Sequence, residues 1–204
     1  MLHVKSGVSN KKHVPKGELP TIPDIVVCGK EEDVYHYSLH HLWKRLKARD
    51  VCLYGTISRT KEEVTSDLIQ EGLDVSSYIE EGCLRVVDFL SLADRNSETS
   101  DPVDVLLSIG RDSLVPEKFF DVLNVEFQSL REKEPKRRFS AILDSVDRMI
   151  VLIGLMNFLS FEKMIYDLFK DQDCQGVGLL YNEFLADDMI SLMKRIAGIF
   201  VEIE

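Results

Sequence analysis

The sequence predicts an α/β fold, with a mainly parallel central sheet flanked by helices on both faces. Two observations support this prediction. Short apolar runs rich in valine, isoleucine and leucine alternate with longer segments in which apolar residues recur every three or four positions. Wholly apolar strands are typical of parallel sheets, because such sheets are buried on both faces. Strand-then-helix repeats are the units from which these sheets are built.

The first twenty residues differ from the rest of the chain in composition. They are polar and basic, and they contain two glycines and two prolines. We therefore expect a basic, partly ordered N-terminal arm over residues 1–20. The remaining residues, 21–204, have the length and apolar content of one α/β domain.

The first half of this domain is predicted to contain three strands and three helices. The predicted strands are apolar runs bounded by turn residues, and they cover 24–28, 51–56 and 84–89. The predicted helices place apolar residues on one face, and they cover 31–48, 61–71 and 75–80. Thr60, followed by Glu63 three residues later, has the spacing of a capping box at the start of the second helix.

The second half repeats the pattern after a polar loop at 94–102. A helix is predicted from Pro116, a residue favoured in the first helical turn. The remaining predictions are two helical stretches within 147–171, a further helix, and three strands. In chain order, the elements after the loop are the helix 116–133, the strand 139–144, the helical stretches, the strand 176–181, the helix 187–196 and the strand 199–203.

Composition disfavours several classes of function. The formal net charge of −10 makes general nucleic-acid binding unlikely, because such a surface repels phosphate backbones. None of the four cysteines forms a Cys-x-x-Cys pair, which favours free thiols in a reducing cytoplasm. No apolar stretch has the length of a signal peptide or a membrane span, so we expect a cytoplasmic protein without membrane contact.

Several segments, in order, resemble the RecA-like ATPase domains of the KaiC-like group, which is common in archaea. The most specific match runs from Gly72-Leu73-Asp74 to Leu84-Arg85-Val86-Val87-Asp88. The other matching segments are Val14-Pro15-Lys16-Gly17, Cys52-Leu53-Tyr54-Gly55-Thr56, Ile142-Leu143-Asp144-Ser145 and Ile196-Ala197-Gly198-Ile199-Phe200-Val201-Glu202. The resemblance covers about residues 14–204. It implies a RecA-like P-loop NTPase fold, and it implies subunits that assemble side by side.

The chain departs from this family at the phosphate-binding loop, the Walker A motif. The family has a glycine-rich turn that ends in Gly-Lys-Thr or Gly-Lys-Ser, which holds phosphate and Mg²⁺. Here Gly29 and Lys30 follow the first strand directly, and the acids Glu31, Glu32 and Asp33 come next. The resemblance therefore implies a degenerate Walker A motif at Gly29–Asp33. The stretch Ile57-Ser58-Arg59 also replaces the paired acids that follow the family's second strand.

Electrostatics supports this interpretation. The start of a helix attracts anions, and in an ATPase that anion is phosphate. Here the three carboxylates of the first turn supply the negative charge that the start of the helix attracts. One unit-charge clash at about 4 Å costs roughly 4 kcal/mol at an effective dielectric constant of about 20. Two such clashes would cancel a micromolar affinity, which corresponds to about 8 kcal/mol.

Asp144 and Ser145 occupy the position of a residual Walker B motif at the end of a strand. One interpretation is a remaining contact with Mg²⁺ or nucleotide, since such folds place ligands at strand ends. The interpretation that we favour is an inherited aspartate that is now hydrogen-bonded to the neighbouring backbone. Neither interpretation assigns a catalytic residue.

The histidines and the surface aromatic residues suggest weaker sites. No cysteine or acid has an obvious ligand spacing to His36, His40 and His41, so no metal site is predicted. Trp43 is a candidate interface residue, because tryptophan is common at protein contacts. The last strand alternates in the manner of an edge strand, which could pair with another subunit. Its candidate interface residues are Ile199, Val201 and Ile203.

The sequence thus favours a RecA-like, KaiC-related pseudo-ATPase that is not an enzyme and has no cofactor. We expect a regulatory or scaffold protein, with a role in signal transduction, that acts through a protein partner or self-association. One alternative is an ATPase with a rearranged ATP and Mg²⁺ site that uses Lys30 or the basic residues at 136–138 of a neighbouring subunit. A second alternative is an accessory protein of DNA recombination, supported only by the basic arm.

Overall fold

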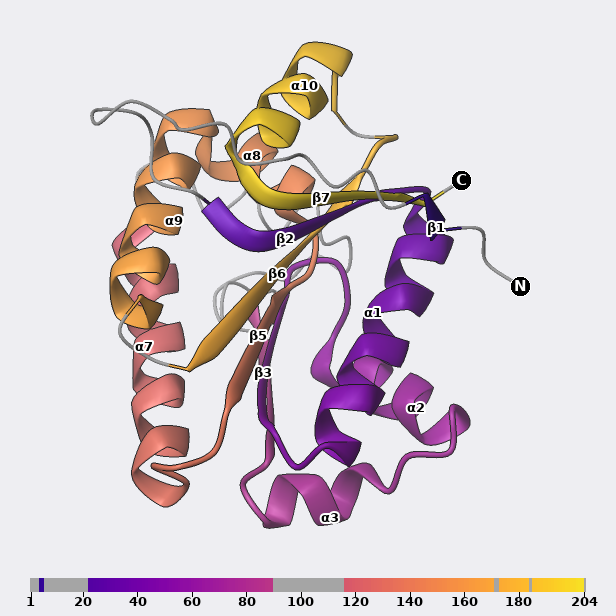
Figure 1. The fold of residues 1–204 in the computed structure, drawn as a ribbon, viewed down its shortest axis with the longest axis vertical. Coiled ribbons are helices and arrows are strands. Elements are labelled where there is room, and N and C mark those ends of the chain that lie inside the picture. Colours follow the sequence, from indigo (N-terminus) through magenta and orange to yellow (C-terminus); the bar gives the residue numbers. More distant parts are fainter. Residues whose placement is uncertain (1–3, 6–21, 90–115, 171–172, 184, 204) are drawn as a thin grey trace, which may run out of the picture.

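The computed structural model describes residues 4–5, 22–89, 116–170, 173–183 and 185–203 (Figure 1). Within these ranges the chain forms one seven-stranded sheet with the order β1-β7-β2-β6-β5-β3-β4. β1 pairs antiparallel with β7, and every other neighbouring pair is parallel. The strands are β1 (Val4–Lys5), β2 (Ile22–Gly29), β3 (Val51–Thr56), β4 (Leu84–Asp88), β5 (Phe139–Leu143), β6 (Cys174–Tyr181) and β7 (Ala197–Ile203).

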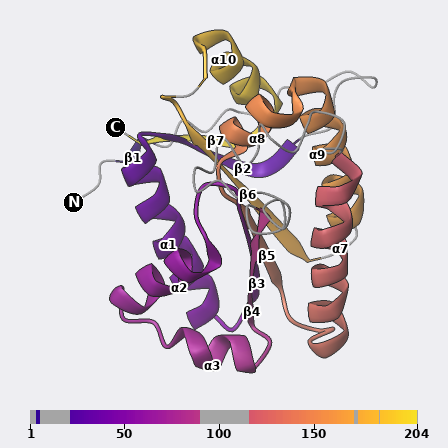
Figure 2. The same ribbon diagram turned by 180° about the vertical axis from the view of Figure 1, so that it is seen from behind.

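Helices cover both faces of the sheet, as the two opposite views show (Figures 1 and 2). One face carries α1 (Glu31–Lys47), α2 (Lys61–Gln70) and α3 (Val75–Glu80). The other face carries α7 (Pro116–Lys133), α8 (Val146–Ile153), α9 (Leu155–Phe169) and α10 (Asp187–Ile196). The predicted α/β architecture is therefore confirmed. No helix in the described ranges combines the length and the apolar character that crossing a bilayer requires.

Side-chain alternation along the strands divides the apolar interior into two cores. In β3, Val51 and Leu53 pack with the α7–α10 layer, whereas Cys52 and Tyr54 pack with the α1–α3 layer. Every residue of β3 is buried. Successive side chains of a strand point to opposite faces, so a central strand covered on both sides must be apolar throughout.

The local signals in the sequence match the observed helices closely. Thr60 Oγ1 accepts a hydrogen bond from the backbone N–H of Glu63 at 3.2 Å, and Glu63 accepts one from the N–H of Thr60 at 2.7 Å. These two bonds confirm the predicted capping box. The loop predicted at 94–102 and the segment 14–17 lie outside the described residues.

The prediction of an edge position for the last strand is only partly correct. β7 lies between β1 and β2, and β1 pairs with its final residues, Ile203 and Glu202. Val4–Lys5 of the N-terminal arm thus form a short strand that the sequence did not reveal. Within the described part of the chain, residues before Glu202 in β7 have β2 as their neighbouring strand.

Candidate functional site

The candidate site lies where four neighbouring strands end. The sheet order places β2, β6, β5 and β3 side by side. Their carboxyl ends carry Gly29, Tyr181, Asp144 and Thr56, and Asp144 follows directly on β5. Open α/β folds bind ligands at this edge of the sheet.

Asp144 is the centre of this site, and its side chain is fully buried. The hydroxyls of Thr56 and Ser58 lie 3.0 and 2.5 Å from Oδ2. The hydroxyl of Ser145 lies 3.0 Å from Oδ1, which also accepts a hydrogen bond from the hydroxyl of Tyr181. A carboxylate offers about four lone-pair positions, and here four hydroxyls surround it. The single proton of the Thr56 hydroxyl can go either to Asp144 or to the carbonyl oxygen of Arg59, 3.1 Å away, so Asp144 accepts three or four hydrogen bonds without any ligand.

The surrounding tyrosines are suited to donate rather than accept hydrogen bonds. Burial raises the pKa of Tyr181 well above its usual value, and nearby Asp144 raises that pKa further. Burial likewise raises the pKa of Tyr54, whose hydroxyl lies 3.2 Å from that of Ser38. Both phenols stay protonated at any physiological pH. The interior at these strand ends is therefore a layer of hydroxyl groups, in which Tyr181 donates to Asp144.

Asp147, in the first turn of α8, is a second buried acid that the sequence did not single out. Its Oδ1 accepts a hydrogen bond from the backbone N–H of Tyr181 at 3.1 Å, which ties α8 to the end of β6. Its Oδ2 has no hydrogen-bond partner in the described part of the chain. Burial raises the pKa of Asp147 to about 7, against the lowering effect of its backbone hydrogen bonds and Arg148. Its position three residues after Asp144 was the available signal.

The connection between β2 and α1 consists of one residue. β2 ends at Gly29, Lys30 is exposed in an extended conformation, and α1 begins at Glu31. A Cβ atom on Gly29 would lie 2.7 Å from the carbonyl oxygen of Ile203 in β7. Gly29 is thus required by the close approach of β7, and that packing accounts for its small size.

Glu31 joins this connection to two other elements. Arg148 of α8 lies 3.1 Å from Glu31 Oε2 and 3.3 Å from Oε1. Arg59, from the segment between β3 and α2, lies 3.4 Å from Oε1. The guanidinium of Arg59 also stacks 3.8 Å from the ring centre of Tyr35, and Tyr35 donates to Asp67 at 2.7 Å. At the start of α1, two arginines thus surround a carboxylate that belongs to the chain itself.

Two solved structures share this arrangement of elements. The flagellar accessory protein FlaH from Methanocaldococcus jannaschii matches with a TM-score of 0.59 and 15% identity, over 92% of this chain and 73% of FlaH. The uncharacterized protein PH0321 from Pyrococcus horikoshii, solved in complex with an unknown peptide, matches with a TM-score of 0.61 and 16% identity. That match covers 91% of this chain and 79% of PH0321. The fold is RecA-like. No family model and no curated protein matches the sequence.

The predicted interface residues have different environments in this RecA-like fold. Trp43 is half-buried at the margin of the α1-side core, 6.2 Å from the parallel ring of His40, with Lys47 5.4 Å from its ring centre. Val201 and Ile203 are buried in the same core, so their side chains are not available to a partner. Ile199 is half-exposed. Only Trp43 and Ile199 therefore remain candidates for contact.

The histidines of α1 do not form a metal centre. His36 lies 3.5 Å from Glu71, and burial lowers the pKa of His41 to about 4. No group of three or more histidine, cysteine or acidic side chains is placed to bind a metal ion in the ranges that the structure describes. The candidate site is therefore the group around Asp144, together with the Glu31–arginine pairs.

Proposed function

We propose that this protein is a catalytically inactive RecA-like protein, a pseudo-ATPase, that acts as a regulatory or scaffold protein through protein contacts. The observation that supports this proposal best is the environment of Asp144. The carboxylate that would face Mg²⁺ in an ATPase is fully buried here and surrounded by four hydroxyls. A metal ion would have to displace several of these hydroxyls, leaving their buried oxygen atoms without partners.

The start of α1 supports the same proposal. A one-residue connection cannot wrap around a phosphate group, because such a loop needs several backbone N–H groups directed at the ligand. Glu31 already lies between Arg59 and Arg148. Glu32 and Asp33 add two further carboxylates to the first turn. An entering triphosphate would meet negative charge, and the two arginines are already paired with Glu31.

Two exposed apolar side chains near the junction of α8 and α9 are the observation on which we base a role in protein contact. Val151 is 67% exposed and Met156 is 73% exposed, and they flank Gly154, where the two helices meet. Large apolar side chains at such exposure mark interaction surfaces when they cluster. The PH0321 structure contains a bound peptide, which is a property of that protein. Analogy of fold supports a peptide or protein partner, and the exposure of Val151 and Met156 is our reason for proposing this junction as the contact.

Isothermal titration with ATP and Mg²⁺ tests the absence of nucleotide binding. We expect no binding tighter than roughly 100 μM and no hydrolysis. Tighter binding, or measurable hydrolysis of ATP, would support the rearranged ATPase and overturn the proposal.

Two paired variants separate the reasons for the absence of binding. Glu32→Gln with Asp33→Asn removes two charges from the start of α1. Asp187→Asn with Asp188→Asn removes two from the start of α10 and serves as the matched control. We expect neither pair to bind ATP, because the short connection and the enclosed Asp144 remain. ATP binding by the first pair alone would show that the carboxylates at the start of α1 were the only obstacle. It would contradict the proposal that the enclosed Asp144 also prevents binding.

A charge placed on the exposed junction tests the role in protein contact. Chemical crosslinking followed by sedimentation velocity would identify a second copy or another protein bound to the full chain. We expect Met156→Glu to abolish that association. Ile69→Glu, at a 57% exposed position on α2, should leave it unchanged. Equal loss in both variants, or loss in neither, would exclude the junction as the contact surface.

A further inference from the structure

A small cavity lies between α9 and the sheet, and its lining includes Leu143, the last residue of β5. Its volume is about 40 Å³, and its walls come from α7, α9, β3, β5 and β6. Ala141, Gly176 and Gly178 form the floor of the cavity on the sheet, and their small size leaves the space open. A cavity of this volume can hold one or a few water molecules and is too small for most organic ligands.

Glu162 of α9 is the only ionisable residue that lines this cavity among the described residues. Its side chain is 4% exposed, and it has no hydrogen-bond or ion-pair partner in the part of the chain that the structure describes. Burial alone raises the pKa of Glu162 to about 8. Leu123 of α7, Leu53 of β3 and the lining residues of β5 and β6 carry no charge that could offset this effect.

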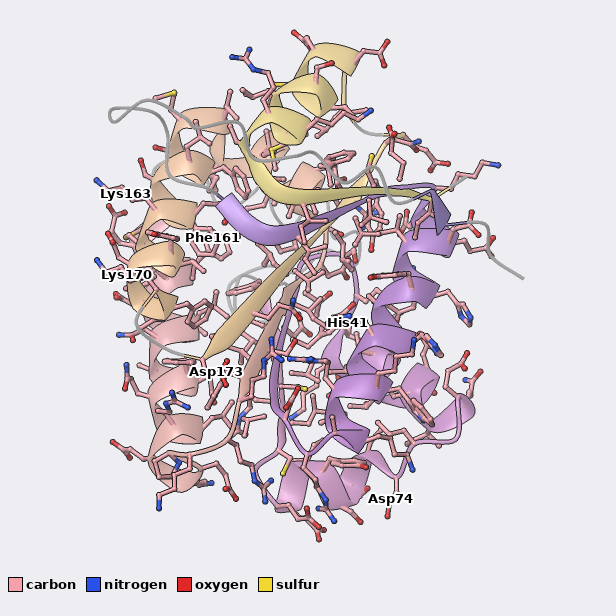
Figure 3. All side chains as sticks on the ribbon, in the orientation of Figure 1. His41, Asp74, Phe161, Lys163, Lys170 and Asp173 are labelled. Atoms are coloured by element: carbon pink, nitrogen blue, oxygen red, sulfur yellow. The ribbon has the colours of Figure 1, made fainter. Side chains whose placement is uncertain are left out.

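Neither Lys163 of α9 nor Lys170, the residue that follows α9, lines the cavity. Figure 3 shows Lys163 and Lys170 on the outer side of the helix, whereas Phe161 lies on the side toward the sheet. Lys163 is exposed, and Lys170 pairs with Asp167 at 2.9 Å. The inner face of α9 therefore carries one unpaired carboxyl group among buried aromatic residues, Phe158 and Phe161.

The junction of α8 and α9 is a single glycine. Gly154 joins the two helices with φ at +80°, and a Cβ atom there would have no neighbour within 4 Å. Residues in such junctions can absorb the backbone rotation of a moving element. α9 could therefore move relative to the sheet without movement of α8, which Asp147 holds to β6.

We propose that the protonation state of Glu162 controls how firmly α9 packs on the sheet. With the carboxyl group neutral, α9 closes the cavity. When α9 lifts, water reaches the carboxyl group, which then ionises and releases its proton. Opening of α9 therefore becomes easier as the pH rises from the ordinary range of a glutamate toward that of the buried group.

Movement of α9 would also affect the exposed junction of α8 and α9. α9 carries Met156 at its first turn, so movement of the helix would change the apolar surface offered to a partner. This consequence rests on the proposed function. The movement of α9 does not, and it can be measured on the free protein.

Hydrogen exchange of backbone amides, corrected for the intrinsic pH dependence, tests the movement. Between about pH 5.5 and 7.5, we expect the opening constant of α9 to rise by at least tenfold in the natural protein. We expect no rise in the Glu162→Gln variant. Glu132→Gln, which changes an exposed residue of α7, should behave like the natural protein.

Amides of α1, on the opposite face of the sheet, distinguish local opening from global unfolding. A rise confined to α9 supports the proposal. An equal rise in α1 and α9 would show that Glu162 affects only global stability, and it would overturn the proposal. A rise in α9 that persists in Glu162→Gln would also overturn it.

Discussion

Asp144 and Glu162 are both buried acids beside the same sheet, yet their surroundings are opposite. Four hydroxyls surround Asp144, whereas Glu162 faces an apolar cavity without a described partner. A buried polar group destabilises a protein when its hydrogen bonds are unmade and is tolerated when they are satisfied. Burial alone therefore does not reveal whether an acid stabilises the fold. Asp144 is integrated into the structure by its hydrogen bonds, whereas our proposal makes Glu162 a residue that destabilises the fold as the pH rises.

The largest expected effect comes from removing the satisfied acid. Asp144→Ala leaves hydroxyls of three elements without their acceptor, so we expect the free energy of unfolding to fall by about 3 kcal/mol or more. Urea denaturation monitored by circular dichroism measures this loss. Asp167→Ala, at an exposed position on α9, is the control and should cost less than about 0.5 kcal/mol. An unchanged denaturation midpoint in Asp144→Ala would contradict the structural role of this residue.

Replacement of the unsatisfied acid should have the opposite sign. Glu162→Leu fills the cavity and removes a buried ionisable group, so we expect a gain on the order of 2 kcal/mol near pH 8. The folded-state pKa of about 8 lies above the ordinary value of 4.5, so the neutral form is favoured by folding. The part of the stability that depends on neutral Glu162 is therefore fully present below about pH 4.5 and is lost as the pH rises toward 8.

The pH dependence of the gain in Glu162→Leu tests whether ionisation of Glu162 is its cause. The gain in Glu162→Leu should shrink as the pH falls and should be smallest near pH 4.5. Urea midpoints at several pH values would show this trend. A gain in stability that does not depend on pH would mean that Glu162→Leu acts through packing alone and not by removing an ionisable group.

A smaller effect is expected at Glu31, which is charged and only partly buried. A double-mutant cycle of Glu31→Gln and Arg148→Met should give a coupling energy of about 1 kcal/mol, because both side chains are less than a third exposed. The coupling should decrease in about 1 M salt. The cycle of Glu81→Gln and Arg49→Met, at a pair that is 50% and 66% exposed, should give a smaller value. Equal couplings would show that the pair at the start of α1 is not a special feature of the site.

Much of the fold could be predicted from the sequence, because its signals are local. The capping box at Thr60 and Glu63 depends on residues three positions apart, and it formed as predicted. The helix from Pro116 to Lys133 has the predicted limits, since a terminal signal and an apolar face agree there. Asp144 was also predicted to lie at a strand end, and it follows directly on β5.

The surroundings of Asp144 were decided only by the tertiary structure. Tyr181 lies 37 positions away in the chain, and Ser58 lies 86 positions away. The sequence predicted a backbone environment for Asp144, and the structure instead places hydroxyls around it. The same reason applies to Val201 and Ile203, which alternate like an edge strand but are buried in the α1-side core.

Strands and helices follow from local sequence, because periodicity and capping act over a few residues. Three features depend on contacts between distant segments. The carbonyl oxygen of Ile203 leaves no room for a Cβ atom at Gly29. Glu31 contacts two arginines, and Glu162 lines a cavity. Each of these features depends on which distant elements become neighbours in the sheet order. That order arises from packing of the whole chain, and no short stretch of residues encodes it.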